Sequence, residues 1–242
     1  MMEFDKELDA KNLNCPLPIL RCKKGLSEIA SGQTLKIMAT DPGSVKDFEA
    51  FCKQTGHVMT RRDEDDGVYT FYIKKRAEWY LIFNWYYVAK KLALIASKGS
   101  LDWTYPPFIL ASTAAALDYE VQIFFTFYGL TLLKKDLGDL KVSPLGNPAM
   151  PMPIPMPNFV QMLPGMESMA TMMMKQKIAN KGVASIGELR SACIEASVKL
   201  IACQMTVDLF DFKKTDFIDE IEFGGAATFF EFAGESDVNL FI

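Results

Sequence analysis

Apolar residues recur near helical spacing after Pro16, and they define the first regular segment of the chain. Leu17, Leu20 and Leu26 fall near one face of a helix, which we expect to run from Pro16 to about Ala30. A proline at this place suits a helix start, because its φ angle is preset and its missing N–H leaves no donor unpaired in the first turn.

The segments from residue 33 to residue 75 add one more helix and three strands. Apolar and polar residues alternate in "QTLKIMAT" (33–40), which predicts a strand. An Asp-Pro-Gly turn at 41–43 leads into a helix that Ser44 caps and Gly56 ends. Residues 57–75 predict a hairpin that turns within "DEDDG". With an extended opening arm the order is βαβαββ, so we expect residues 1–75 to form a two-layer sandwich with both helices on one face.

A run of aromatic residues, "RAEWYLIFNWYYVAK" (76–90), follows this first domain. We interpret it as a connector whose aromatic side chains serve buried packing or a contact between protein copies. Beyond it, "KLALIASKG" predicts an apolar strand that ends before a loop. "PPFILASTAAALDY" predicts a helix opened by its prolines, and "EVQIFFTFYGL" predicts a buried strand.

The rest of the chain continues the alternation of strands and helices after an irregular insert. Residues 144–176 are rich in proline and methionine and cannot form one helix, because proline removes helical donors. "SIGELRSACIEASVK" and "KKTDFIDEI" predict helices, "LIACQM" predicts a short strand, and "EFGGAATFFEFAG" with "VNLFI" is expected to finish the sheet. Residues 91–242 are therefore expected to form a doubly wound parallel α/β domain with its site at the carboxyl ends of the strands.

The composition of the chain excludes some classes of function but does not identify one. The formal net charge of -4 argues against a general nucleic-acid binder, and the single histidine excludes a zinc site built from several histidines. The five cysteines are odd in number and form no Cys-x-x-Cys pair, and no apolar leader is visible at the N-terminus. We expect a cytoplasmic, reducing location.

Two apolar segments are candidates for membrane spans. The aromatic connector is interrupted by Asn84, Lys90 and Lys91, while the apolar run after residue 106 carries Asp118 and Glu120. Neither reaches the roughly 18 to 20 uninterrupted apolar residues that a span needs. We expect no transmembrane helix, and contact of the connector with a membrane surface stays open.

The methionines raise the question of a metal. Nine of the 14 methionines lie between Met150 and Met174, and thioethers are ligands for Cu(I). Proline alternates with them and neither cysteine nor histidine is adjacent, so an adaptable apolar surface is the favoured interpretation. The stretch "GGAAT" lacks the spacing of a nucleotide-binding fingerprint. No metal and no cofactor are expected.

Cys15 stands directly before the helix start, in the pattern Cys-Pro-x-Pro formed with Pro16 and Pro18. The free N–H groups and the positive end of the helix dipole stabilise an anion there, so we expect a lowered pKa and a reactive thiolate. The alternative is a buried cysteine that merely begins the helix. Cys22 follows about 10 Å along the helix axis, too far for a disulfide. It is expected in the core, as are Cys52 and Cys193.

The stretches "NCPLPILRCKKGL", "ATDPGSVKDFEAFCKQTGHVM" and "GVYTFYIKK" resemble the TusA-like sulfur carrier family over nearly all of residues 7–75. The resemblance implies that Cys15 carries a persulfide, with Pro16 and Pro18 as the supporting helix start. One departure is the pair Lys11-Asn12, which stands where the family usually has Arg-Gly. This keeps the positive charge but removes the glycine, at a place that concerns partner docking.

Cys203 ends the apolar run "LIAC" and is followed by the polar Gln204, so its side chain could emerge where the strand meets the loop. On the residues alone, a buried strand cysteine is favoured. However, "STAAALDYEVQIFFTFYGL", "LIACQMTVDLF", "EFGGAATFFEF" and "VNLFI" resemble the large-insert branch of the DsrE-like family. That resemblance implies a sulfur-accepting Cys203 and a homo-oligomer formed through this domain. Residues 92–108 depart from the family's usual first loop.

Together the two resemblances predict a persulfide relay: a TusA-like carrier joined to a DsrE-like sulfurtransferase in sulfur trafficking or dissimilatory sulfur oxidation. The expected partners are sulfur-donating and sulfur-accepting proteins, such as rhodanese-like sulfurtransferases, with no direct nucleic-acid contact. Transfer between Cys15 and Cys203 would be effectively intramolecular. Two alternatives stay open. One is a relay for tRNA thiolation, and the other is a non-catalytic oligomeric adaptor that docks a membrane or a protein partner.

Overall fold

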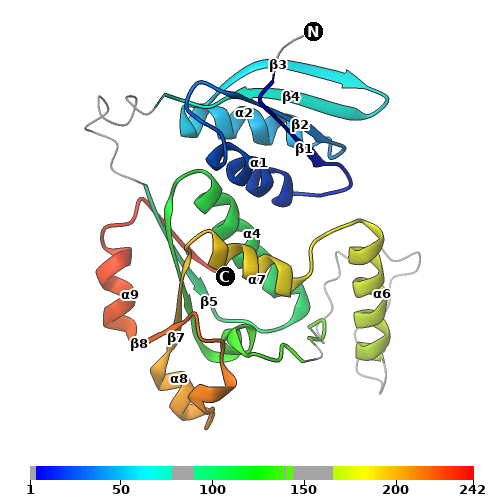
Figure 1. The fold of residues 1–242 in the computed structure, drawn as a ribbon. Coiled ribbons are helices and arrows are strands. Elements are labelled where there is room, and N and C mark those ends of the chain that lie inside the picture. The colour runs from blue at the N-terminus through cyan, green and yellow to red at the C-terminus, as the bar shows by residue number, and fades with distance from the viewer. Residues whose placement is uncertain (1–3, 78–89, 139, 144–165) are drawn as a thin grey trace.

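The computed structural model describes residues 4–77, 90–138, 140–143 and 166–242 of the 242 residues, and these form two units with one sheet each (Figure 1). The predicted aromatic connector lies almost wholly outside the described residues, as does most of the predicted insert. We call residues 4–77 the N-terminal unit and residues 90–242 the C-terminal unit.

The N-terminal unit is the expected βαβαββ sandwich. Its sheet has the order β1-β2-β4-β3, with β1 parallel to β2 and the other neighbours antiparallel. Helices α1 and α2 share one core with the sheet, and Figure 1 shows them on the side that faces the C-terminal unit. The elements are β1 (Lys6–Ala10), α1 (Leu17–Ser27), β2 (Thr34–Ala39), α2 (Ser44–Thr55), β3 (Val58–Asp65) and β4 (Val68–Lys74).

The C-terminal unit has a parallel sheet in the order β8-β7-β6-β5-β9. Helices α4 and α7 pack in the larger core on one face, and α9 packs in a smaller core on the other. This confirms the predicted α/β class. The elements are β5 (Lys91–Ala96), α4 (Leu101–Ala116), β6 (Glu120–Phe125), η1 (Phe127–Leu133), α6 (Met166–Asn180), α7 (Ile186–Glu195), β7 (Lys199–Cys203), α8 (Gln204–Leu209), η2 (Lys214–Asp216), β8 (Glu222–Gly224), α9 (Ala226–Ala233) and β9 (Val238–Phe241).

Two predicted helix starts were wrong. Ser44 does not cap α2, since it is the first helical residue, and its buried hydroxyl has no hydrogen-bond partner among the described residues. Helix α4 begins at Leu101, so Pro106 and Pro107 lie inside it rather than at its start. The residue before the helix, Ser100, has extended backbone geometry and ends the loop after β5.

Two further predictions near the C-terminus were also wrong. The stretch "KKTDFIDEI" forms only the short turn η2, and "AATFFEFA" forms helix α9 instead of a strand. In α9 the buried residues Phe229 and Ala233 are four positions apart, which is helical spacing that a run of small and aromatic residues conceals. The predicted strand over 120–130 stops at Phe125, where η1 follows.

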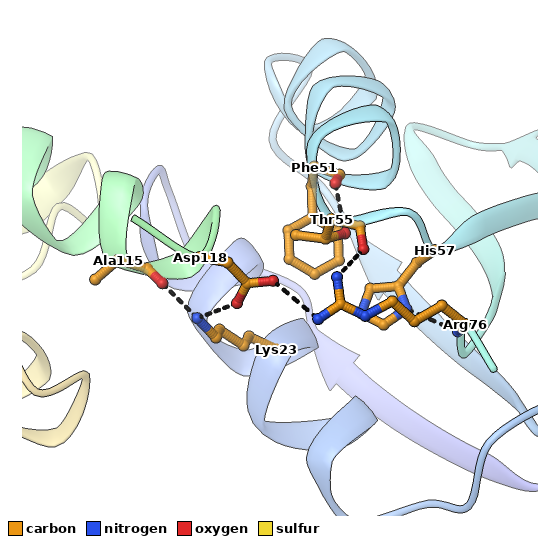
Figure 2. A network of polar contacts seen from close by, with 7 residues as sticks. All are labelled: Lys23, Phe51, Thr55, His57, Arg76, Ala115 and Asp118. Atoms are coloured by element: carbon orange, nitrogen blue, oxygen red, sulfur yellow. Dashed lines mark hydrogen bonds and ion pairs between the residues drawn. The ribbon is translucent and has the colours of Figure 1, made fainter. Parts of the chain in front are cut away.

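The two units meet through a polar network around Asp118, which follows the end of α4 (Figure 2). One carboxylate oxygen of Asp118 lies 2.9 Å from Lys23 Nζ, and the other lies 3.4 Å from the Arg76 guanidinium. Lys23 also donates to the carbonyl of Ala115, and Arg76 donates to the carbonyl of Thr55. Asp118 therefore ties α1 and the end of the N-terminal unit to the end of α4.

His57 completes this network from the N-terminal unit. Its Nδ1 accepts a hydrogen bond of 3.0 Å from the backbone N–H of Arg76, and its ring stacks on Phe51. Burial lowers the pKa of His57 to about 4, and the neighbouring charge of Arg76 adds to this, while Asp118 opposes it. A cavity of about 230 Å³ lies beside these groups.

The neutral state of His57 makes folding sensitive to acid. Because the folded pKa lies below the value near 6.5 of an unfolded chain, the unfolded state binds more protons between these values. This contribution to stability is fully present above pH 6.5 and is lost as the pH falls toward 4. We expect the melting temperature to fall over this interval, and His57→Gln, which keeps an acceptor for Arg76, to reduce the fall. Equal slopes in thermal unfolding of both proteins would contradict this.

Candidate functional site

Cys15 lies in the loop immediately before α1, and it is exposed. Pro16 occupies the N-cap position and Pro18 the second helical position. The N–H of Leu17 donates to the carbonyl of Asn14 at 3.0 Å, which closes the turn that leads into the helix. The prolines therefore begin a helix next to the cysteine, as the sequence predicted.

The electrostatic surroundings of Cys15 differ from the prediction. Its backbone N–H donates to a carboxylate oxygen of Asp41 at 3.2 Å, and its thiol hydrogen-bonds with the side chain of Asp47 in the first turn of α2. Although the residue as a whole is exposed, partial burial of the thiol together with the charges of Asp47 and Asp41 raises the pKa of Cys15 to about 11. The predicted lowering is wrong, because burial of the thiol and the two carboxylates both favour its neutral form.

Cys203 is the last residue of β7 and the residue before the first turn of α8. Its position at the carboxyl end of the strand was predicted, but its side chain does not emerge into solvent. Only 5% of Cys203 is exposed, and it packs in the smaller core with Phe124, Ile201 and Phe229. The sulfur therefore lies on the side of the sheet that α9 covers.

Hydrogen bonds around Cys203 favour its charged form. Partial burial raises the pKa of the Cys203 thiol, but bonds from the side chain and backbone N–H of Thr206, from the Thr126 side chain and from the Met205 N–H outweigh it, and the pKa is lowered overall. The hydroxyls of Thr126 and Thr206 lie 3.2 Å apart. These two threonines were not predicted. Thr206 had a signal in the sequence, because the third residue after an N-cap presents its N–H to that cap.

The loops beside Cys203 are held by close backbone contacts. A Cβ on Gly129 would lie 2.2 Å from the carbonyl oxygen of Ala96, and one on Gly99 would lie 2.4 Å from that of Tyr128. Two residues before Gly129, Phe127 has a φ angle of 47°, which is unusual for a bulky residue. Its N–H points to the Thr206 hydroxyl at 3.3 Å. This strained backbone therefore fixes Thr126 and Phe127 against the start of α8.

The other three cysteines are core residues, as predicted. Cys22 and Cys193 have no exposed surface, and Cys52 is 7% exposed. Burial raises the pKa of Cys193 to about 12 and that of Cys52 to about 11, so both stay protonated at neutral pH. The Cys193 thiol donates to the carbonyl of Phe108. None of these thiols has the surroundings of a nucleophile.

The structure does not bring Cys15 and Cys203 together. Cys15 lies against Thr113, in the last turn of α4, which leads to the start of β6. Cys203 lies at the carboxyl ends of the strands of this parallel sheet, whereas Thr113 lies near their amino ends. Figure 1 shows α8, which follows Cys203, on the far side from the N-terminal unit. The six residues of β6 span about 20 Å between these two ends of the sheet's strands.

Exposed apolar side chains surround the carboxyl end of β7, where Cys203 lies. Met205 and Leu209 of α8 are 56% and 57% exposed, and Phe127 and Tyr128 of η1 are 46% and 68% exposed. Across the described ranges, no three His, Cys, Asp or Glu side chains are arranged to hold a metal ion. Within the same ranges, no helix combines the length and the apolar character that crossing a membrane requires.

Comparison with known proteins agrees with this division into two units. A sequence model of the DsrE/DsrF/DrsH-like family matches residues 88–241, and one of the sulfurtransferase TusA matches residues 6–75. The sulfur carrier protein DsrE2 of Allochromatium vinosum is 68% identical over 157 residues, which is 63% of this chain and 98% of that protein. The sulfur carrier protein TusA of the same organism is 60% identical over 75 residues, 31% of this chain and 99% of that protein.

Solved structures give weaker matches. A SirA-like protein from Desulfitobacterium hafniense has a TM-score of 0.28 at 23% identity and covers 30% of this chain and 99% of its own. The ychN protein from E. coli has a TM-score of 0.40 at 11% identity and covers 63% of this chain and 99% of its own. Neither structure adds to the assignment at these scores. On its sequence, the chain belongs to the DsrE/DsrF/DrsH-like family and carries a TusA unit ahead of the family's region.

Proposed function

We propose that this protein is a persulfide carrier in which Cys15 and Cys203 each hold a sulfane sulfur atom. The observation that carries the proposal is the Cys203 thiol, whose charged form is favoured by Thr126, Thr206 and the start of α8. A thiolate is the nucleophile in sulfur exchange. Support also comes from the two relatives named sulfur carrier proteins, which match the two units separately.

The exchange at Cys203 needs no cofactor. Its thiolate attacks the outer sulfur of a donor persulfide, so a new S–S bond forms on Cys203 while the donor's S–S bond breaks. The donor leaves as a thiolate, and the transferred sulfur keeps its proton or loses it to solvent. Reversal of these steps passes the sulfur to an acceptor thiolate. The partners are therefore proteins that present a cysteine persulfide or a free thiolate.

Cys15 reacts through the small fraction that is ionised at neutral pH, because burial and nearby carboxylates raise its pKa to about 11. Asp47 contributes to this, since its charge and its hydrogen bond with the Cys15 thiol both favour the neutral form. Burial raises the pKa of the Asp47 carboxyl, and the charge of Asp41 adds to this, while the bond to Cys15 opposes it. In this proposal the Cys15 proton is released to the partner or to solvent as the new S–S bond forms.

The two thiols serve separate partners in this proposal, because they lie near opposite ends of the strands of the C-terminal sheet. The exposed side chains of Met205, Leu209 and Tyr128 supply apolar contact area for a partner at the Cys203 edge. The proposal includes a cytoplasmic location and a homo-oligomer formed through the C-terminal unit. The tRNA-thiolation route and the adaptor role stay alternatives that no observation on the described residues favours.

Sulfur loading tests the proposal directly. We expect the wild-type chain, mixed with a persulfide-loaded sulfurtransferase, to gain the mass of one sulfur atom at each reactive cysteine. Cys15→Ser and Cys203→Ser should each lose one of these gains, and the core variant Cys193→Ser should keep both. Intact mass spectrometry with peptide mapping reads the result. Wild-type protein that gains no sulfur, or serine variants that load like wild type, would disprove the relay.

Thr206 should control the reactivity of Cys203. In Thr206→Val the thiolate loses its side-chain hydrogen bond, so the pKa of Cys203 should rise and alkylation at pH 7 should slow by about tenfold. Thr206→Ser should stay close to wild type. The rate for the Cys203 peptide is measured against pH and scaled to its high-pH plateau, which corrects for burial. Identical pH midpoints in wild type and Thr206→Val would refute this role.

Asp47 should raise the pKa of Cys15, whereas Thr206 lowers that of Cys203. Replacing its carboxylate in Asp47→Asn removes a negative charge from beside the thiol, so the pKa of Cys15 should fall from about 11. Iodoacetamide labelling of the Cys15 peptide at pH 8 should become about tenfold faster. Glu49→Gln, on the same helix, is the matched control and should leave the rate unchanged. A slower or unchanged rate in Asp47→Asn would show that Asp47 does not set this pKa.

A further inference from the structure

The loop that carries Cys15 contacts the C-terminal unit. Asn14, the residue before Cys15, donates to the carbonyl of Lys181, and a Cβ on Gly182 would lie 3.1 Å from the carbonyl oxygen of Asn12. On the other side of the interface, Gln54 donates to the Tyr119 hydroxyl at 3.3 Å. Together with the Asp118 network, these contacts hold the loop before α1 against the C-terminal unit.

Thr113 of α4 is the residue that meets Cys15 across this interface. It lies in the last turn of the helix, five residues before Asp118. Its hydroxyl oxygen is buried and has no hydrogen-bond partner among the described residues. The same hydroxyl acts on the Cys15 thiol, since it lowers the pKa of that thiol against the larger effects of burial and the carboxylates. The hydroxyl thus approaches the sulfur without reaching full hydrogen-bond geometry.

An unpartnered buried hydroxyl is costly, because a donor taken from water normally finds an acceptor. A neutral thiol is a weak acceptor, whereas a thiolate is a strong one. The other groups that act on the Cys15 sulfur, Asp47 and Asp41, are carboxylates and cannot donate when ionised. Thr113 is therefore the group in this set that can stabilise a negative sulfur.

We propose that Thr113 is a positioning residue for Cys15 and that its hydroxyl donates to the Cys15 sulfur when that sulfur is ionised. The carrier site of the N-terminal unit is then completed by a side chain of the C-terminal unit. This inference rests on the proposed function only in taking Cys15 as the reacting thiol. The TusA of Allochromatium vinosum matches 31% of this chain along 99% of its own length, so its match does not extend to α4.

The test compares full-length wild type with Thr113→Val, Thr113→Ser and Thr104→Val. Iodoacetamide labels each protein between pH 7 and pH 12, a range that extends beyond the raised pKa of Cys15, and peptide mapping follows the Cys15 peptide alone. We expect Thr113→Val to slow labelling at pH 8 by threefold to tenfold and to move the pH midpoint upward, because the donor to the thiolate is lost. Thr113→Ser, which restores the hydroxyl, should fall within twofold of wild type.

Thr104→Val is the matched control, since it makes the same change in the same helix at a buried hydroxyl that donates to the Leu101 carbonyl. It should leave Cys15 labelling unchanged. The proposal is overturned if Thr113→Val labels like wild type, if Thr113→Ser is as slow as Thr113→Val, or if Thr104→Val slows labelling equally. Should Thr113→Val not fold, Thr113→Ala takes its place in the comparison.

Labelling of Cys15 requires no sulfur donor, so this result is independent of the relay. A shifted midpoint in Thr113→Val without sulfur loading of the wild-type chain would sustain this inference and defeat the proposed function. Loading of wild type without any shift in Thr113→Val would do the reverse.

Discussion

The ion pairs of Asp118 with Lys23 and Arg76 set the arrangement on which the rest of the structure depends. They hold the N-terminal unit at the amino ends of the strands of the C-terminal sheet, next to the last turn of α4. That position determines which groups surround Cys15, and Cys203 lies away from them, at the carboxyl ends of the strands. A carboxylate with two partly buried cationic partners is costly to leave unpaired, so loss of one partner weakens the contact more than a surface pair would.

The two thiols have opposite local chemistry. Hydrogen bonds from Thr206, Thr126 and a backbone N–H favour the charged form of Cys203, while burial and two carboxylates favour the neutral form of Cys15. Cys203 thus ionises more readily, while Cys15 holds its proton beside Asp47. Under the proposed function, such a difference suits two sulfur sites that meet different partners, and it argues against two equivalent thiols in rapid exchange.

Local pattern was sufficient for most of the fold and for the place of each candidate cysteine in it. Helical spacing and the two prolines located α1, and the apolar run before Gln204 located the end of β7. The charge state of Cys15 was predicted wrongly because it depends on burial of the thiol and on Asp41 and Asp47, which are distant in sequence and meet the thiol only in the folded chain. Helix α9 was missed for a related reason, since its apolar spacing is clear only once the face against the sheet is known.

The burial of Cys203 has a consequence for how long a bound sulfur would last. Small thiols of the cell destroy a persulfide by attacking either of its sulfurs, and that attack needs an open line of approach. With Phe229 and Phe124 packed around it, the inner sulfur of a loaded Cys203 is screened from such reductants. Loss of the sulfur as sulfide, which follows attack on the inner sulfur, would therefore be slowed, while the outer sulfur stays the point of transfer.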